Sequence, residues 1–122
     1  MRCTPLTAQD KTRLTRAVSD VRKKYKVTTN NSEGFCAVVC CDLYMNKMAP
    51  GYYPYSVMVG EDEHVILVNA DKEIIDPTGD QFRFPLFSWL PGMKQSYRRP
   101  IKLTQSEIDA VRREAAARLS KS

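Results

Sequence analysis

The chain has 122 residues, 43% of them hydrophobic and 27% charged, with a formal net charge of +5. This length and composition predict a single globular domain over residues 1–122 with a core of modest size. The sequence has no run of about eighteen apolar residues and no apolar signal-peptide core after Met1, which argues against a membrane span and general export. We therefore expect a cytoplasmic protein, with delivery into another cell left open.

The excess of basic residues raises the question of an acidic partner, because a chain with a pI near 9.1 is attracted to nucleic acid and anionic membranes. On both predicted terminal helices, however, basic residues alternate with Asp or Glu. That pattern favours solvated helix faces over a nucleic-acid groove, and we expect no membrane partner. The basic residues on or directly after these two segments include Arg13, Arg16, Arg22, Lys23, Lys24, Lys26, Arg112, Arg113 and Arg118.

Two terminal helices are predicted from capping residues and periodicity. Residues 7–25 begin with Thr7 three residues before Asp10, and the last helix begins with Thr104 three residues before Glu107. Both spacings fit a capping box. Each helix also carries one apolar stripe at helical spacing. The stripes are Leu14, Val18, Val21 and Tyr25 in the first helix and Ile108, Val111, Ala115 and Leu119 in the last.

Residues 35–48 are apolar on nearly every side. A helix without a polar face is buried, so we expect this segment to lie in the middle of the fold. A buried strand over residues 38–41 is the competing interpretation. The length of the apolar run and the entry through Gly34 favour the helix.

Three antiparallel strands are expected next, at residues 55–59, 64–69 and 73–76. The first two are joined by an acidic turn, and the last two by a tight turn at Ala70 and Asp71. A turn centred near Ala70 pairs Val68 with Lys72, Ile66 with Ile74 and His64 with Asp76. Directly opposed side chains have Cβ atoms about 4.5 to 5.5 Å apart. The only histidine of the chain therefore gains an acidic partner.

Residues 83–100 show no clear period and are rich in proline and aromatic residues. We expect an ordered loop there that lays aromatic side chains over the core and walls a substrate cleft.

The four cysteines lack the regular spacing of a disulfide framework, so a reducing compartment is the simpler assumption. Cys36 has the best position for a nucleophile, because backbone N–H groups and the helix dipole stabilise a thiolate in the first turn of a helix. Cys40 and Cys41 lie a turn deeper and are expected to be structural. Cys3, near the N-terminus, is the least suited of the four.

The order of a cysteine, a histidine at the head of a strand and an acidic residue after the next strand resembles the papain-like and transglutaminase-like superfamily of cysteine enzymes. The matching residues are Gly34 and Cys36 at a helix start, the strand HVILV from His64, and the run IID that ends at Asp76. The longer run IIDPTGDQF resembles a motif of small bacterial and phage members. The likeness spans residues 30–82.

This resemblance implies an α+β fold in which an antiparallel sheet packs on a central helix bearing Cys36, with flanking N- and C-terminal helices. It implies that Cys36 is the nucleophile, His64 the general base and then acid, and Asp76 the residue that orients the imidazole. The implied enzyme is a peptidase, deamidase, amidase or acyl transferase that acts on a protein or peptide without a cofactor. The candidate oxyanion donors are Asn30, Asn31 and Gln81.

Each candidate also has a simpler interpretation. Cys36 fits a core position, His64 a polar strand end, and Asp76 a turn residue before a proline. Gln81 fits a cap of the next turn as well as it fits a site. A zinc site of Cys36, Cys40 and His64 is disfavoured because no CxxC pair and no second histidine exist, so we expect no metal.

The alternative function is a non-catalytic, basic binding protein for nucleic acid or an acidic protein partner. A degenerate member of the same fold is included in that alternative. Selective reactivity of Cys36 would distinguish the enzyme from the binder.

Overall fold

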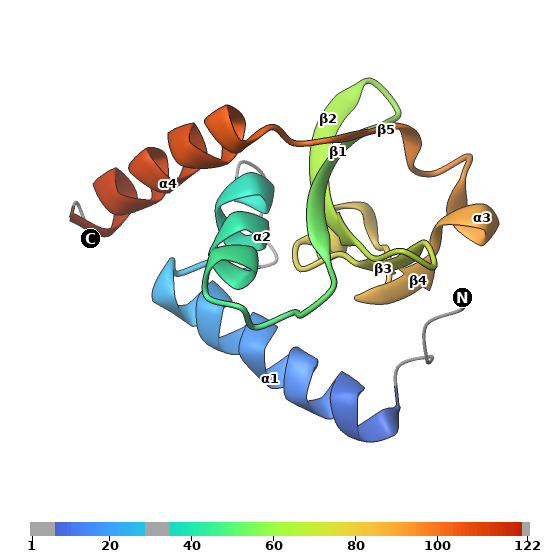
Figure 1. Cartoon of the computed structure of the whole chain (residues 1–122), viewed down its shortest axis with the longest axis horizontal. Coiled ribbons are helices and arrows are strands. Elements are labelled where there is room, and N and C mark those ends of the chain that lie inside the picture. The colour runs from blue at the N-terminus through green and yellow to red at the C-terminus, as the bar shows by residue number, and fades with distance from the viewer. Residues whose placement is uncertain (1–6, 29–34, 121–122) are drawn as a thin grey trace.

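The computed structural model describes residues 7–28 and 35–120, which form an α+β structure with an open antiparallel sheet (Figure 1). The sheet has the order β4-β3-β2-β1-β5. The helices are α1 (Ala8–Lys24), α2 (Cys36–Met45), the 3-10 helix η1 (Gly79–Phe82), α3 (Leu90–Met93) and α4 (Gln105–Ser120). The strands are β1 (Tyr53–Val59), β2 (Asp62–Val68), β3 (Glu73–Ile75), β4 (Phe87–Trp89) and β5 (Arg98–Lys102).

Both predicted capping boxes are confirmed. The amide of Asp10 donates to the Thr7 hydroxyl at 3.0 Å, and the Thr7 amide donates back to the Asp10 carboxylate. Thr104 and Glu107 exchange the same pair of hydrogen bonds at the start of α4. These contacts satisfy backbone donors that a helix leaves without partners at its N-terminus.

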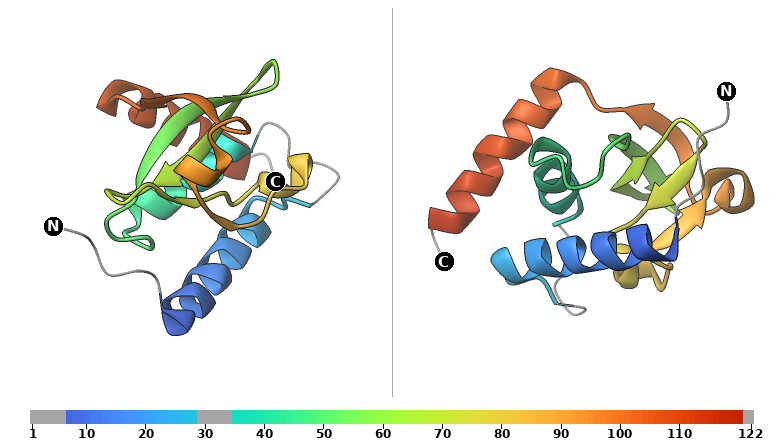
Figure 2. Two further views of the ribbon diagram at one scale, coloured as in Figure 1. Left: turned by 90° about the vertical axis from the view of Figure 1, so that its right-hand side faces the viewer. Right: turned by 60° about the horizontal axis from the view of Figure 1, so that its bottom comes forward.

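Helix α2 lies at the centre, as its apolar composition predicts, and contacts α1, α4, β1 and β2. Figure 2 shows α1 and α4 on either side of it. The competing strand over residues 38–41 is therefore wrong, and the helix ends at Met45, three residues earlier than expected. Its fully buried side chains are Val38, Val39, Cys40, Cys41 and Leu43.

The stripe of α1 packs against this central region. Leu14, Val18, Val21 and Tyr25 are all buried, as expected. In α4, Ile108 and Ala115 are buried, and the other two residues of the stripe are partly buried against the core.

Strands β1 and β2 pair in the expected hairpin, but the predicted register between β2 and β3 is wrong by two residues. Val68 pairs with Ile74 and Leu67 with Ile75. The turn is longer than expected because the Asn69 side chain accepts the amides of Asp71 and Glu73. A shift of two residues leaves every side chain on its original face. His64 and Asp76 therefore stay on one face, as diagonal neighbours instead of direct partners.

The predicted loop over residues 83–100 contains secondary structure that the sequence did not indicate. It includes β4, α3 and the start of β5, and β4 and β5 form the two edges of the sheet. Strand β4 has only three residues, and all five residues of β5 are exposed. Neither strand therefore shows the alternation of apolar and polar residues that identifies a half-buried strand.

Candidate active site

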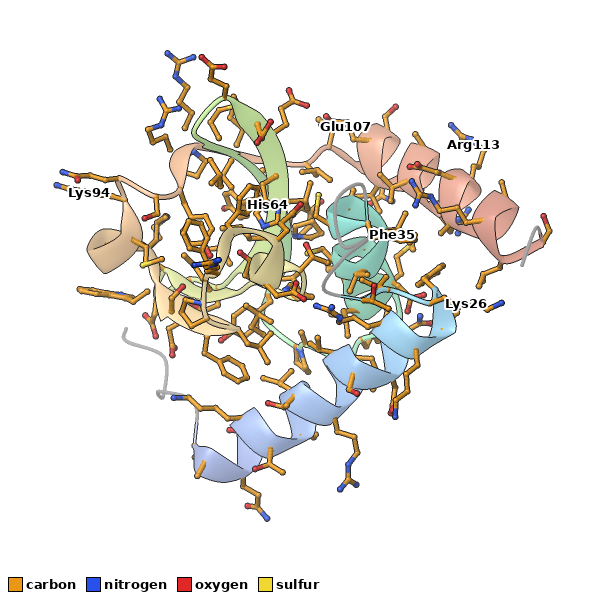
Figure 3. All side chains as sticks on the ribbon, turned by 180° about the vertical axis from the view of Figure 1, so that it is seen from behind. Lys26, Phe35, His64, Lys94, Glu107 and Arg113 are labelled. Carbon is orange, nitrogen blue, oxygen red and sulfur yellow. The ribbon has the colours of Figure 1, made fainter. Side chains whose placement is uncertain are left out.

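Cys36, His64 and Asp76 come together at the junction of the central helix and the sheet. Cys36 is the first residue of α2, His64 lies on β2, and Asp76 directly follows β3. His64 Nε2 lies 2.8 Å from Asp76 Oδ1, and the Cys36 side chain is near enough to His64 to contribute to the raised pKa of the imidazole. Figure 3 shows His64 on the sheet beside the start of α2, where Phe35 is labelled.

The three side chains differ in exposure. The side chains of His64 and Asp76 are both fully buried, whereas Cys36 is partly exposed. Solvent therefore reaches Cys36, whereas the imidazole and the carboxylate are shielded from water. Burial by itself lowers the pKa of His64, but the hydrogen bond with Asp76 and the neighbouring Cys36 outweigh burial and raise this pKa to about 9.

A tyrosine that no sequence pattern indicates holds the second oxygen of Asp76. The hydroxyl of the buried Tyr97 donates to Asp76 Oδ2 at 2.7 Å. Burial and the neighbouring Asp76 carboxylate raise the pKa of Tyr97, so its hydroxyl stays protonated and remains a donor. Asp76 thus binds His64 through one oxygen and Tyr97 through the other.

Gly79 makes room for this carboxylate. A Cβ atom at position 79 would lie 2.9 Å from both Cγ and Oδ2 of Asp76 and 3.2 Å from the Phe84 carbonyl oxygen. A side chain larger than hydrogen would therefore push the Asp76 carboxylate away from its partners. The glycine of the DPTG run is thus part of the support of the candidate site.

Gln81 and Phe82 contact the imidazole from η1. Gln81 Nε2 lies 3.2 Å from His64 Nδ1, so this predicted donor candidate lies at the site. The Phe82 ring meets the imidazole edge to face, with centroids 4.9 Å apart and planes at 86°. Such a contact favours one ring orientation.

Arg22 of α1 fixes the segment between Asp76 and Gln81. Its guanidinium makes two parallel hydrogen bonds to the Asp80 carboxylate, at 2.9 and 2.8 Å, and one to the Pro77 carbonyl oxygen at 2.8 Å. Bidentate guanidinium–carboxylate pairs are strong and directional. The sequence indicates only a charged helix residue at Arg22, because 58 residues separate it from Asp80.

Cys40 and Cys41 lie in the core, as expected for structural cysteines. Cys40 and Cys41 are fully buried, and the Cys40 thiol donates to the Val65 carbonyl oxygen. Burial and the neighbouring Cys36 raise the pKa of both thiols, that of Cys41 to about 12. Both therefore stay protonated near neutral pH. Cys3, Asn30 and Asn31 lie outside the described residues.

Within residues 7–28 and 35–120, no cluster of His, Cys, Asp and Glu side chains has the arrangement of a metal site. In the same part of the chain, no helix has the length and apolar character needed to span a membrane. No protein-family model, curated protein or solved structure matches the chain.

Proposed function

We propose that the protein is a cysteine-dependent hydrolase or acyl transferase that acts on amide or peptide carbonyls of a protein or peptide substrate. Cys36 is the nucleophile, His64 the general base and then acid, and Asp76 the residue that orients the imidazole. The observation that carries the proposal is the fully buried hydrogen bond between His64 and Asp76, with the partly exposed Cys36 close enough to the imidazole to affect its pKa.

The chemistry follows from the positions of the protons. Asp76 accepts the hydrogen on His64 Nε2, which leaves Nδ1 as the nitrogen that takes the proton of the Cys36 thiol. The sulfur then attacks the carbonyl carbon, and the electron pair of the C=O bond moves to the oxygen. His64 returns the proton to the leaving nitrogen as the C–N bond breaks, and water or another acceptor resolves the thioester.

The position of Cys36 at the start of α2 supports this role. The first backbone N–H groups of a helix have no partner within the helix, and the positive end of the helix dipole favours a thiolate there. We further propose that the fold is a papain-like or transglutaminase-like core. A helix with a cysteine at its N-terminus, packed on antiparallel strands, supports that assignment, as does the placement of the histidine on β2 and of the acidic residue directly after β3.

An acylation assay tests the proposal without knowledge of the natural substrate. With p-nitrophenyl acetate, we expect one equivalent of p-nitrophenolate to be released in a burst and one acetyl group to appear on Cys36 by peptide mass mapping. Cys36→Ala should abolish the burst, and Cys41→Ala, a matched change at a buried thiol, should retain it. A wild-type protein without Cys36 acetylation would contradict the enzyme and favour the basic binding protein.

A further inference from the structure

Five side chains around the imidazole form a closed series of contacts. His64 bonds to Asp76 Oδ1 at 2.8 Å, and Asp76 Oδ2 accepts the Tyr97 hydroxyl at 2.7 Å. The Tyr97 ring meets Phe84 edge to face, with centroids 5.1 Å apart and planes at 69°. The centroids of Phe84 and Phe82 lie 5.7 Å apart, and the Phe82 ring meets the imidazole. Because the series closes on itself, a turn of any one member breaks contacts on both of its sides.

Tyr97 holds the end of the carboxylate that points away from His64. Both Tyr97 and Asp76 are buried, so water does not reach the contact between hydroxyl and carboxylate. Within residues 7–28 and 35–120, the Tyr97 hydroxyl is the one side-chain donor to Oδ2. The Tyr97 backbone is also held, because its N–H donates to the Met93 carbonyl oxygen at 2.8 Å. The phenol therefore approaches Oδ2 from a fixed position.

The hydroxyl also changes the charge that the imidazole meets. Its O–H dipole points its positive end at the carboxylate, and hydrogen bonds to ionised groups are strong. A carboxylate that is shared with a second donor stabilises an imidazolium less than one that bonds to the imidazole alone. Other titratable or charged groups around the pair are Cys36 and Cys40 of α2, Asp80 of η1 and Arg22 of α1. Asp80 and Arg22 pair with each other, so their charges offset.

We propose that Tyr97 is a positioning residue of the candidate site, which turns Asp76 Oδ1 toward His64 and draws part of the carboxylate's charge away from the imidazole. The inference rests on the proposed function and adds a residue to its site. Tyr97 touches neither the thiol nor the substrate in this role. It acts on the imidazole through Asp76.

The step that depends on this role is the hydrolysis of the thioester on Cys36. The water oxygen binds the carbonyl carbon as one water proton passes to His64, and the C–S bond then breaks with its electron pair on sulfur. His64 takes that proton only when it is neutral. Since Asp76 helps to raise the pKa of His64 to about 9, a stronger pull by Asp76 would confine hydrolysis to still higher pH. Tyr97 restrains that pull.

An NMR titration of the imidazole tests the proposal directly. His64 is the only histidine of the chain, so isotope-labelled histidine gives one set of imidazole resonances. Tyr97→Phe removes the hydroxyl and keeps the ring. It should raise the pKa of His64 by roughly one unit, a part of the net contribution of a hydrogen bond to a charged group. Tyr52→Phe is the matched control, because the buried Tyr52 hydroxyl has no partner among the described residues. It should leave the pKa of His64 unchanged.

A second variant should move the pKa of His64 in the opposite direction. Fluorotyrosine at position 97, with fluorine beside the hydroxyl, has nearly the size of tyrosine and is a stronger donor. It should therefore lower the pKa of His64. An unchanged pKa of His64 in folded Tyr97→Phe would show that Tyr97 only fills space and would overturn the proposal. If Tyr97→Phe does not fold, an unchanged or raised pKa in the fluorotyrosine protein would overturn it.

The reaction itself gives the second readout. After acetylation with p-nitrophenyl acetate and removal of the reagent, peptide mass mapping follows the loss of the acetyl group from Cys36. A free acetyl thioester measures the background from hydroxide. The pH midpoint of the loss should rise in Tyr97→Phe along with the pKa of His64, and an unchanged midpoint beside a raised pKa would overturn the role in the reaction. If wild-type Cys36 is never acetylated, the proposed function fails, an outcome that the NMR titration does not depend on.

Discussion

The hydrogen bond from Tyr97 to Asp76 should make a measurable contribution to folding stability. Tyr97→Phe deletes the hydroxyl and leaves the ring, which packs edge to face on Phe84 with centroids 5.1 Å apart. The lost contact joins a hydroxyl to a buried carboxylate at 2.7 Å. No water can replace the donor without opening the core, because the Tyr97 side chain is 1% exposed.

The magnitude follows from the charge on the acceptor. A hydrogen bond to a charged group contributes about 1.5–3 kcal/mol net, and loss of a donor leaves the remaining partner partly unsatisfied. We therefore expect Tyr97→Phe to lower the free energy of unfolding by about 2 kcal/mol at neutral pH. Tyr52→Phe is the matched control, because the buried Tyr52 hydroxyl has no hydrogen-bond partner among the described residues. Its loss should cost less than about 0.5 kcal/mol.

Urea unfolding followed by the fluorescence of Trp89, the single tryptophan, measures both changes on one scale. The two substitutions remove the same atom from the same residue type, so effects on the unfolded state largely cancel. Equal losses for the two variants would refute the idea that Tyr97 stabilises the Asp76 carboxylate. A stability loss confined to Tyr97→Phe would support it.

Three further predictions concern the support of the site. Because the pKa of His64 is raised from 6.5 to about 9 by folding, its contribution is present in full below pH 6.5 and is lost as the pH rises through 9, by about 3 kcal/mol at most. Asp80→Asn breaks the charge pair with Arg22 and should cost about 1–2 kcal/mol, together with a fall in the rate of Cys36 acetylation. Gly79→Ala places a Cβ within 2.9 Å of the Asp76 carboxylate and should cost about 1–3 kcal/mol.

Each of these three has a comparison that isolates its cause. The contribution of His64 to stability is the difference between wild type and His64→Gln in how the free energy of urea unfolding depends on pH. The same pH dependence in both proteins would contradict the prediction. Glu114→Gln, in an exposed pair on α4, should cost less than about 0.5 kcal/mol, so an equal effect of Asp80→Asn would remove the special role of Asp80. Gly92→Ala, whose Cβ would meet nothing closer than 3.9 Å, should be near neutral.

Local sequence signals predict α1, α2 and α4 and the contact of His64 with Asp76, because these features depend on residues close together in the chain. Thr7 with Asp10 and Thr104 with Glu107 determine helix starts over a single turn. His64 and Asp76 share a sheet face through strand alternation alone, so the prediction survived a register error of two residues.

The remaining support of the site depends on contacts between distant segments, which no local pattern contains. Tyr97 lies 21 residues from Asp76 and Arg22 lies 58 residues from Asp80. Gln81 is a candidate donor from its sequence position, but its contact with Nδ1 of His64 becomes visible only in the folded structure. Tertiary hydrogen bonds, not residue types, therefore define these roles.

The most direct test of the central claim is the rate of Cys36 alkylation by iodoacetamide at pH 7 in wild type and in His64→Gln, resolved by peptide mass mapping. The buried Cys40 and Cys41 will react slowly in any case, so dependence on His64 is the informative quantity. An ordinary thiol is only about 3% thiolate at this pH, which leaves room for activation of more than tenfold. We predict that His64→Gln slows Cys36 about tenfold or more while the fold is retained. Equal rates in the two folded proteins would contradict an activated thiol and with it the proposed enzyme.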